Sequence, residues 1–153
     1  MREFNEFYEW HIDKKAAYMV EALRKRHFIV ELAGTKEEAK EILLSMIPKG
    51  STIGLGGSQT VLHLDVLDDL RSDNYKLLDR YDEKYDVAPD SHFGVVRDSL
   101  MSDVFITSSN AVTLNGEVLN IDCSGSRVSA ITYGPKKVII VLGVNKLVKE
   151  YSF

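Results

Sequence analysis

Glycine and hydroxyl residues follow a short apolar run of the sequence, and together they have the chemistry of an anion-binding turn. Gly56 and Gly57 leave the backbone bare for close approach of a ligand, and Ser58 and Thr60 place hydroxyls where a helix is expected to begin. A phosphate or a carboxylate would fit there. A structural interpretation is equally open, in which the glycines form a tight turn and Ser58 caps the helix.

A second polar turn follows the buried strand that is predicted over residues 103–107. It contains Ser108, Ser109 and Asn110, whose side chains favour hydrogen bonding over packing. Asn110 could orient a carbonyl or hydroxyl of a ligand, or it could fix the hairpin that comes next. Both interpretations remain open from the sequence.

A third segment, residues 120–127, gathers a carboxylate, a thiol, hydroxyls and a guanidinium around another expected helix start. Arg127, just after Gly125, suits a bidentate grip on a carboxylate or phosphate. Asp122 could take part in catalysis or form a structural ion pair with Arg127. Cys123 has no histidine beside it, and packing is a commoner role for a lone thiol than nucleophilic catalysis. The catalytic residues therefore stay unassigned.

No metal site or cofactor is predicted from the residue pattern. The four histidines lack the spacing of metal ligands; they are His11, His27, His63 and His92. The acidic stretch that holds Asp79, Asp82, Asp86 and Asp90 is more typical of a solvated loop than of a cation site. A single cysteine excludes an internal disulfide, and it excludes a cage of cysteines for zinc or an iron–sulfur cluster within one chain.

Helices and short apolar strands alternate along the chain, which predicts an α/β fold with a mostly parallel sheet flanked by helices. A long amphipathic helix is expected over residues 4–26, and Thr35 with Glu38 predicts a capping box that opens a helix through Ile47. Leu114-Asn115-Gly116 predicts a β-hairpin insertion. Strands are expected over residues 28–32, 51–55, 75–78, 103–107 and 137–142, and helical segments over 60–70, 95–101 and 127–133, with an irregular loop reaching about residue 91.

Ligands in open α/β sheets bind beyond the carboxyl ends of the strands, so we expect the polar turns to share one sheet edge. The predicted ligand-binding residues are Gly56, Gly57, Ser58, Thr60, Ser109, Asn110, Asp122, Gly125, Arg127 and Lys146.

Composition narrows the class of protein. The 153 residues are 44% hydrophobic and 27% charged, which predicts a single domain over residues 1–153. A net charge of -4 with no basic stripe argues against a nucleic-acid partner. No apolar stretch approaches the roughly 20 residues of a membrane span, and the amino terminus lacks a signal-peptide core, so we expect a cytoplasmic location and no membrane association.

Five segments, in their order and spacing, resemble the LUD (lactate-utilisation) family. They are Gly56-Gly57-Ser58-x-Thr60, Ser108 to Gly116, Asn120 to Val128, Gly134 to Val138, and Gly143-x-Asn145-Lys146. The first helix and Asp79-Arg80-Tyr81 resemble the small bacterial members as well. The resemblance implies the fold shared by sugar-phosphate isomerases and CoA transferases, and a role in oxidation of L-lactate to pyruvate within a multi-protein system.

Two departures from the family pattern bear on chemistry. Similar proteins usually continue past Lys146 with another helix and often a cysteine-containing tail, whereas this sequence ends at Phe153. They more often carry a small residue at position 123. An apolar groove left by the last helix, together with the long first helix, favours a homo-oligomer.

Three functions fit these observations. The first is an accessory component of lactate oxidation that binds a small anion and an iron–sulfur or dehydrogenase protein. The second is an enzyme acting on a phosphorylated sugar or a CoA-like thioester; its candidate bases would be Asp79, Asp122 and Lys146, and Glu117 would be a poor nucleophile. The third is a scaffold that acts through the first helix.

Overall fold

A computed structural model describes residues 2–83 and 89–150, with side chains for residues 7–83 and 92–150. The chain divides into two compact units. The sheet unit consists of Thr35–Ser108 and Ile121–Val141. The helix–hairpin unit consists of Met1–Gly34, Ser109–Asn120 and Leu142–Phe153. The chain therefore passes from one unit to the other several times, and each unit is described by itself.

The sheet unit is built on four parallel strands in the order β2-β1-β3-β6. These are β1 (Thr52–Leu55), β2 (Lys76–Leu78), β3 (Val104–Thr107) and β6 (Lys137–Ile140). Strand β1 lies in the middle, with Gly54 opposite both Leu78 of β2 and Phe105 of β3. The chain first moves outward from β1 to β2 and then returns to β3 on the other side. This reversal creates a topological switch point between β1 and β3, where ligands of open α/β sheets usually bind.

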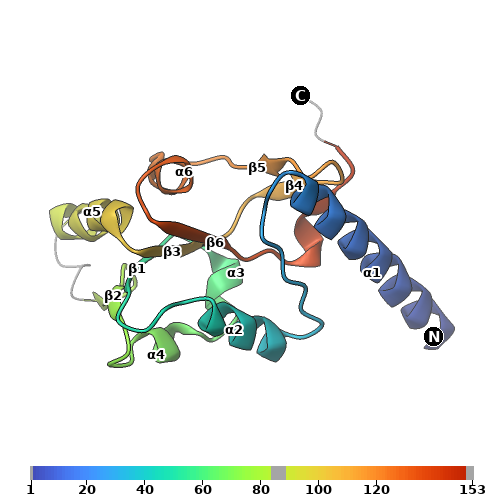
Figure 1. Cartoon of the computed structure of the whole chain (residues 1–153), viewed down its shortest axis with the longest axis horizontal. Coiled ribbons are helices and arrows are strands. Elements are labelled where there is room, and N and C mark those ends of the chain that lie inside the picture. The colour runs from blue at the N-terminus through green and yellow to red at the C-terminus, as the bar shows by residue number, and fades with distance from the viewer. Residues whose placement is uncertain (1, 84–88, 151–153) are drawn as a thin grey trace. The chain divides into compact units, whose positions relative to one another are not determined.

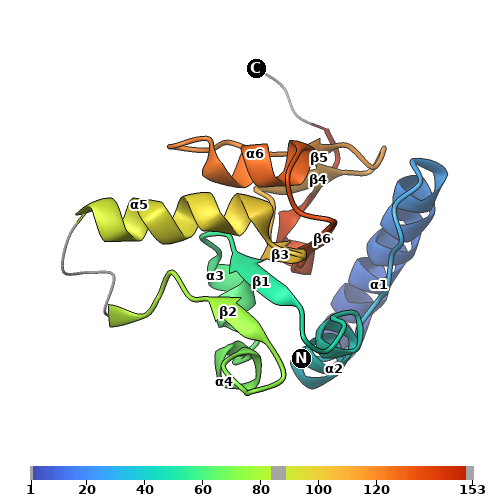
Figure 2. The ribbon, with the colours of Figure 1, turned by 60° about the vertical axis from the view of Figure 1, so that its left-hand side comes forward.

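Helices cover both faces of this sheet, as predicted (Figures 1 and 2). One face carries α5 (Pro89–Asp98), the 3-10 turn η2 (Ser99–Met101) and α6 (Ser126–Thr132). The other carries α2 (Lys36–Ser45), α3 (Gln59–Leu62) and α4 (Leu67–Leu70). The main core lies on this second face, because alternate strand residues point into it; its members include Leu43, Ile53, Leu55, Val61, Leu70, Val104 and Ile106.

Single residues explain two local features of the sheet unit, namely the start of α2 and the close packing of η2 against β1. Thr35 caps α2 by accepting a hydrogen bond from the Glu38 amide at 3.1 Å, as the capping-box prediction requires. On the η2 face, Gly54 leaves room for the buried Ser99 and Ser102; a Cβ at Gly54 would lie 2.8 Å from the Ser99 Cβ.

The helix–hairpin unit contains α1 (Arg2–Lys25), the strands β4 (Ala111–Thr113), β5 (Val118–Leu119) and β7 (Leu147–Val148), and the 3-10 turn η3 (Val144–Lys146). Strands β4 and β5 form the predicted antiparallel hairpin, and β7 adds to β4 in parallel. Met19 and Leu23 of α1 pack with Val112 of β4 in a small core. Gly116 has a φ of +77°, and a Cβ there would lie 2.9 Å from the Ala22 carbonyl, so the hairpin turn requires glycine.

Several expected elements differ in the structure. The strand predicted over residues 28–32 is wrong: this segment is irregular, and Ile29 is 83% exposed. Its apolar run has no neighbouring strand to pair with, and the Val30 carbonyl accepts a hydrogen bond from Arg24 instead. Helix α5 begins at Pro89, earlier than predicted, because proline fits the first position of a helix. Strand β7 was not predicted. Asp86, one of the acids in the predicted irregular loop, lies outside the described residues.

Candidate functional site

The glycine turn begins where β1 ends, at the switch point of the sheet. Gly56 donates its amide hydrogen to the Ile106 carbonyl at 2.9 Å, which joins the turn to β3. A Cβ on Gly56 would lie 2.3 Å from Oγ1 of the buried Thr107, so only glycine fits there. Gly57 is exposed, and the atoms nearest to a Cβ on it would be those of the Arg80 guanidinium, at 3.7 Å. Gly56 therefore serves packing, and Gly57 presents bare backbone to solvent.

The two predicted hydroxyls have structural partners. Ser58 is buried, and its Oγ accepts a hydrogen bond from the Val61 amide at 3.2 Å, which confirms that it caps α3. Thr60 Oγ1 accepts a long hydrogen bond of 3.5 Å from Ser108 Oγ, beyond the end of β3. The turns after β1 and β3 therefore lie side by side, as the sheet-edge argument predicts.

A tyrosine from the segment after β2 braces the glycine turn. The Tyr81 hydroxyl accepts a hydrogen bond from the Ser58 amide at 3.1 Å and donates one to the Gly56 carbonyl at 3.3 Å. These bonds satisfy backbone groups on both sides of Gly57. The conformation of the turn is thus set by a side chain that the sequence pattern did not single out for this role.

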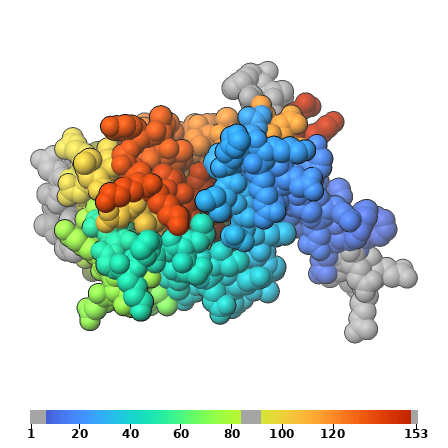
Figure 3. Space-filling view, viewed as in Figure 1, coloured from blue at the N-terminus to red at the C-terminus, as the bar shows by residue number. Residues whose placement is uncertain are grey.

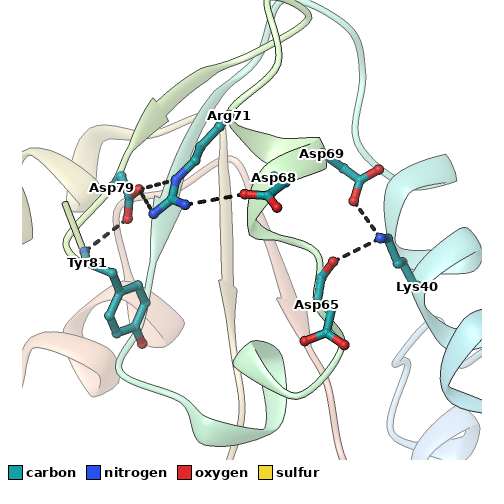
Figure 4. A network of polar contacts seen from close by, with 7 residues as sticks. All are labelled: Lys40, Asp65, Asp68, Asp69, Arg71, Asp79 and Tyr81. Carbon is teal, nitrogen blue, oxygen red and sulfur yellow. Dashed lines mark hydrogen bonds and ion pairs between the residues drawn. The ribbon is translucent and has the colours of Figure 1, made fainter.

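A buried carboxylate holds Tyr81 in place (Figure 4). Asp79 Oδ1 accepts a hydrogen bond from the Tyr81 amide at 2.9 Å, and Asp79 Oδ2 accepts from Nε and Nη2 of Arg71, both at 2.8 Å. The hydrogen bond that Arg71 donates to Asp79 raises the pKa of Arg71 above its ordinary value. Asp79, a candidate base from the sequence, is therefore engaged in a structural network.

Arg80 adds positive charge beside the exposed glycine, and sequence analysis did not include it in the site. Its guanidinium lies next to Gly57, and Nη2 is 3.4 Å from Nε2 of His92 on α5. Because arginine can only donate, any hydrogen bond in this contact runs from Arg80 to His92 Nε2. The signal that could have found Arg80 is the strand register: Gly54 lies opposite Leu78, which brings residue 80 level with Gly56.

The segment before α6 also lies in the sheet unit, where Asp122 and Arg127 have defined partners. Asp122 Oδ2 accepts a hydrogen bond from the Val128 amide at 3.0 Å near the start of α6. Arg127 donates to the Ser108 carbonyl at 3.2 Å and to the Ile121 carbonyl at 2.6 Å. Gly125, with a φ of +76°, precedes the helix in a left-handed conformation. Ser108 and Ile121 flank the excursion over Ser109–Asn120, so Arg127 ties both ends of it.

The family model of the LUD domain matches residues 16–152 of this chain. The chain belongs to the LUD family. Neither the curated proteins nor the solved structures provide a significant match. Membership confirms the family predicted from the five motifs, and it relates the chain to lactate utilisation. Within the described part of the chain, no helix combines the length and apolar character needed to cross a membrane.

The remaining predicted ligand residues of this LUD domain belong to the helix–hairpin unit. Ser109 is fully buried, and Asn110 is exposed, with its amide donating to the Leu119 carbonyl at 3.0 Å. The backbone amide of Asn110 therefore takes part in the hairpin, and the role of its side chain stays a prediction. Lys146 ends η3, and its amide donates to the Gly143 carbonyl at 3.0 Å. Within the sheet unit, hydrogen bonds through Ser108 link Thr60 and Arg127. Ser109, Asn110 and Lys146 belong to the other unit.

Other chemically active side chains of the LUD domain do not gather into a metal site. Among residues 2–83 and 89–150, no three histidine, cysteine or acidic side chains are placed to hold an ion together. Cys123 is exposed. Glu117 accepts a hydrogen bond from Thr113 Oγ1 at 2.9 Å within the helix–hairpin unit.

A hollow of about 400 Å³ in the sheet unit lies away from the glycine turn. Its lining residues surround the amino ends of the strands; they are Pro48, Lys49, Gly50, Ser51, Asp103, Val104, Lys136 and Lys137. We base the candidate site on the carboxyl edge instead, because the switch point, the glycine backbone and the Arg80 guanidinium coincide there.

Proposed function

We propose that this LUD protein binds a small organic anion at the Gly56–Ser58 turn and acts as a cytoplasmic accessory component of L-lactate oxidation to pyruvate. The observation that carries the proposal is the position of Arg80 beside the exposed backbone of Gly57 at the switch point. The Arg80 guanidinium and the backbone amide of Gly57 are both suited to a carboxylate, which lactate and pyruvate share.

The engagement of Asp79 favours an accessory role over catalysis by that residue. Both of its carboxylate oxygens accept hydrogen bonds, Oδ2 from Arg71 and Oδ1 from the Tyr81 amide. A general base needs a free oxygen within reach of the proton that it removes. Oxidation would then occur on a partner, and an iron–sulfur or dehydrogenase protein has the required chemistry.

A thermal-shift and calorimetric titration with L-lactate, pyruvate, inorganic phosphate, a sugar phosphate and CoA tests the proposal. A bound anion at 100 times its Kd adds about 2.7 kcal/mol to the free energy of unfolding. Arg80→Gln should weaken the binding of that anion by roughly tenfold to a hundredfold, since a hydrogen bond to a charged group contributes about 1.5–3 kcal/mol. The matched control is Arg97→Gln, because Arg97 is an exposed arginine on α5, and this variant should leave the affinity unchanged.

Two results would count against this function. Stabilisation by none of these anions, or equal losses in the Arg80 and Arg97 variants, would remove the proposed site. Stabilisation by phosphorylated compounds alone would favour the enzyme that acts on a sugar phosphate or a CoA-like thioester.

A further inference from the structure

The outer face of α1 carries an exposed aromatic stripe, formed by Phe7, Trp10, Lys14 and Tyr18. These residues follow one another at intervals of three and four, so they lie along one side of the helix. Phe7 is 73% exposed, Trp10 54% and Tyr18 58%. The rings of Phe7 and Trp10 contact each other with centroids 5.8 Å apart, and the Lys14 ammonium lies 6.0 Å from the Trp10 ring. Part of α1 is visible at the surface in blue in Figure 3.

The core of the helix–hairpin unit is formed by the side of α1 opposite to the stripe. Ala16, Met19 and Leu23 are buried and lie on the opposite side of the helix by the same spacing argument. Most of the stripe also precedes the part of the chain that the LUD model matches, which begins at residue 16. Phe7 and Trp10 thus lie on a part of α1 that precedes the matched residues. Exposed aromatic residues clustered on one face are typical of interaction surfaces.

The charges of α1 are divided between its two halves. The first half carries one arginine and four acids, Glu3, Glu6, Glu9 and Asp13. From residue 14 to residue 26, one glutamate accompanies five bases, Lys14, Lys15, Arg24, Lys25 and Arg26. Two such helices side by side and antiparallel would place each acidic half against a basic half, whereas a parallel pair would oppose like charges.

We propose that two copies of the protein pair through the aromatic stripes of antiparallel α1 helices. A two-fold axis across the helices makes the contact self-complementary, because each copy supplies the same stripe and the same division of charge. A membrane surface is the less suitable occupant, since the aromatic half of α1 is acidic and anionic lipids would repel it. This inference does not depend on the anion site.

Sedimentation equilibrium of the full chain, combined with the fluorescence of its only tryptophan, Trp10, tests the pairing. Increasing concentration should convert monomer to dimer, shift Trp10 emission to the blue and protect it from iodide. Phe7→Ser should weaken the dimer by at least about tenfold, which corresponds to about 1.4 kcal/mol. Tyr8→Ser is the matched control, because Tyr8 is 62% exposed on the same helix but lies about a quarter turn from the stripe, and it should change the Kd by less than about threefold.

The orientation is tested through charge. Higher salt should weaken an antiparallel dimer, because screening removes the attraction between unlike halves. The pair Lys14→Glu and Lys25→Glu, both on the stripe side of α1 and in its basic half, should also weaken it. A monomer at all concentrations, equal effects of Phe7→Ser and Tyr8→Ser, or Trp10 protection by anionic vesicles alone would overturn the proposal, and a dimer that salt strengthens would overturn its antiparallel arrangement.

Discussion

Gly56 and Gly57 are neighbours in the sequence with separable roles, and single alanine substitutions distinguish them. A Cβ at Gly56 would collide with the buried Thr107, so Gly56→Ala should lower the free energy of unfolding by about 1–3 kcal/mol. The nearest atom to a Cβ at Gly57 is on the Arg80 guanidinium, at an ordinary contact distance of 3.7 Å, so Gly57→Ala should change stability by less than about 1 kcal/mol while weakening anion binding. Urea unfolding and calorimetric titration measure the two effects, and anion binding unchanged in Gly57→Ala would count against that residue as a ligand contact.

At the scale of residues, the sequence predicted the Gly56–Ser58 turn but only some of the side chains that lie around it. The hydroxyl and glycine residues after β1 were identifiable because their chemistry follows an apolar run directly. Tyr81 and Arg80 were not assigned to the site, because their positions depend on which strand lies beside β1. Hydrophobic periodicity indicates a strand at residues 76–78 but does not state its neighbour, and only the pairing of Gly54 with Leu78 brings residues 80 and 81 to the turn.

At the scale of elements, the amino ends of three strands are joined by one carboxylate, which makes this edge sensitive to acid. Asp103 accepts hydrogen bonds from Lys136 at 2.7 Å and from the Thr52 amide at 2.9 Å. The Lys136 hydrogen bond, followed by the Thr52 amide, lowers the pKa of Asp103 below its ordinary 3.8. A lowered pKa means that the stabilisation is present above the ordinary value and is lost as the pH falls through the folded-state value.

The prediction is that stability falls below about pH 4 partly through Asp103, which must then take up a proton. Asp103→Asn should be less stable than the natural protein at pH 6, and the difference should shrink toward pH 2. Glu41→Gln, at an exposed position of α2, is the control, and its free energy of unfolding should change with pH in parallel with that of the natural protein. Urea midpoints across this pH range provide the measurement, and a constant difference for Asp103→Asn would exclude the mechanism.

Elements with strong local signals were predictable, and those defined by distant partners were not. Thr35 with Glu38 specified the start of α2, and Asn115-Gly116 specified the hairpin, because caps and tight turns are set by neighbouring residues. The apolar run over residues 28–32 resembles a strand locally, yet it finds no partner and stays irregular. Conversely, β7 has only two residues and too little periodicity to detect, and it exists because β4 lies beside it.

At the scale of the whole molecule, the path of the chain bears on whether the two units fold together. Neither unit is a continuous segment, because the helix–hairpin unit is assembled from three stretches separated by the sheet unit. Arg127 holds Ser108 and Ile121, the two sheet-unit residues from which the hairpin excursion departs and to which it returns. Loss of order in one unit would release the chain ends that the other unit requires. We therefore expect residues 1–153 to unfold as a single cooperative domain.

The chain offers one probe in each unit for this prediction. In nuclear magnetic resonance spectra, the amide signal of Val112 in β4 reports on the helix–hairpin unit and that of Ile106 in β3 on the sheet unit, because both residues are fully buried. In a Phe7→Ser background, which removes the proposed pairing of α1, urea unfolding followed by the two signals should give coincident midpoints and slopes. Midpoints that differ would mean that the units unfold separately, because each probe would then follow the stability of its own unit.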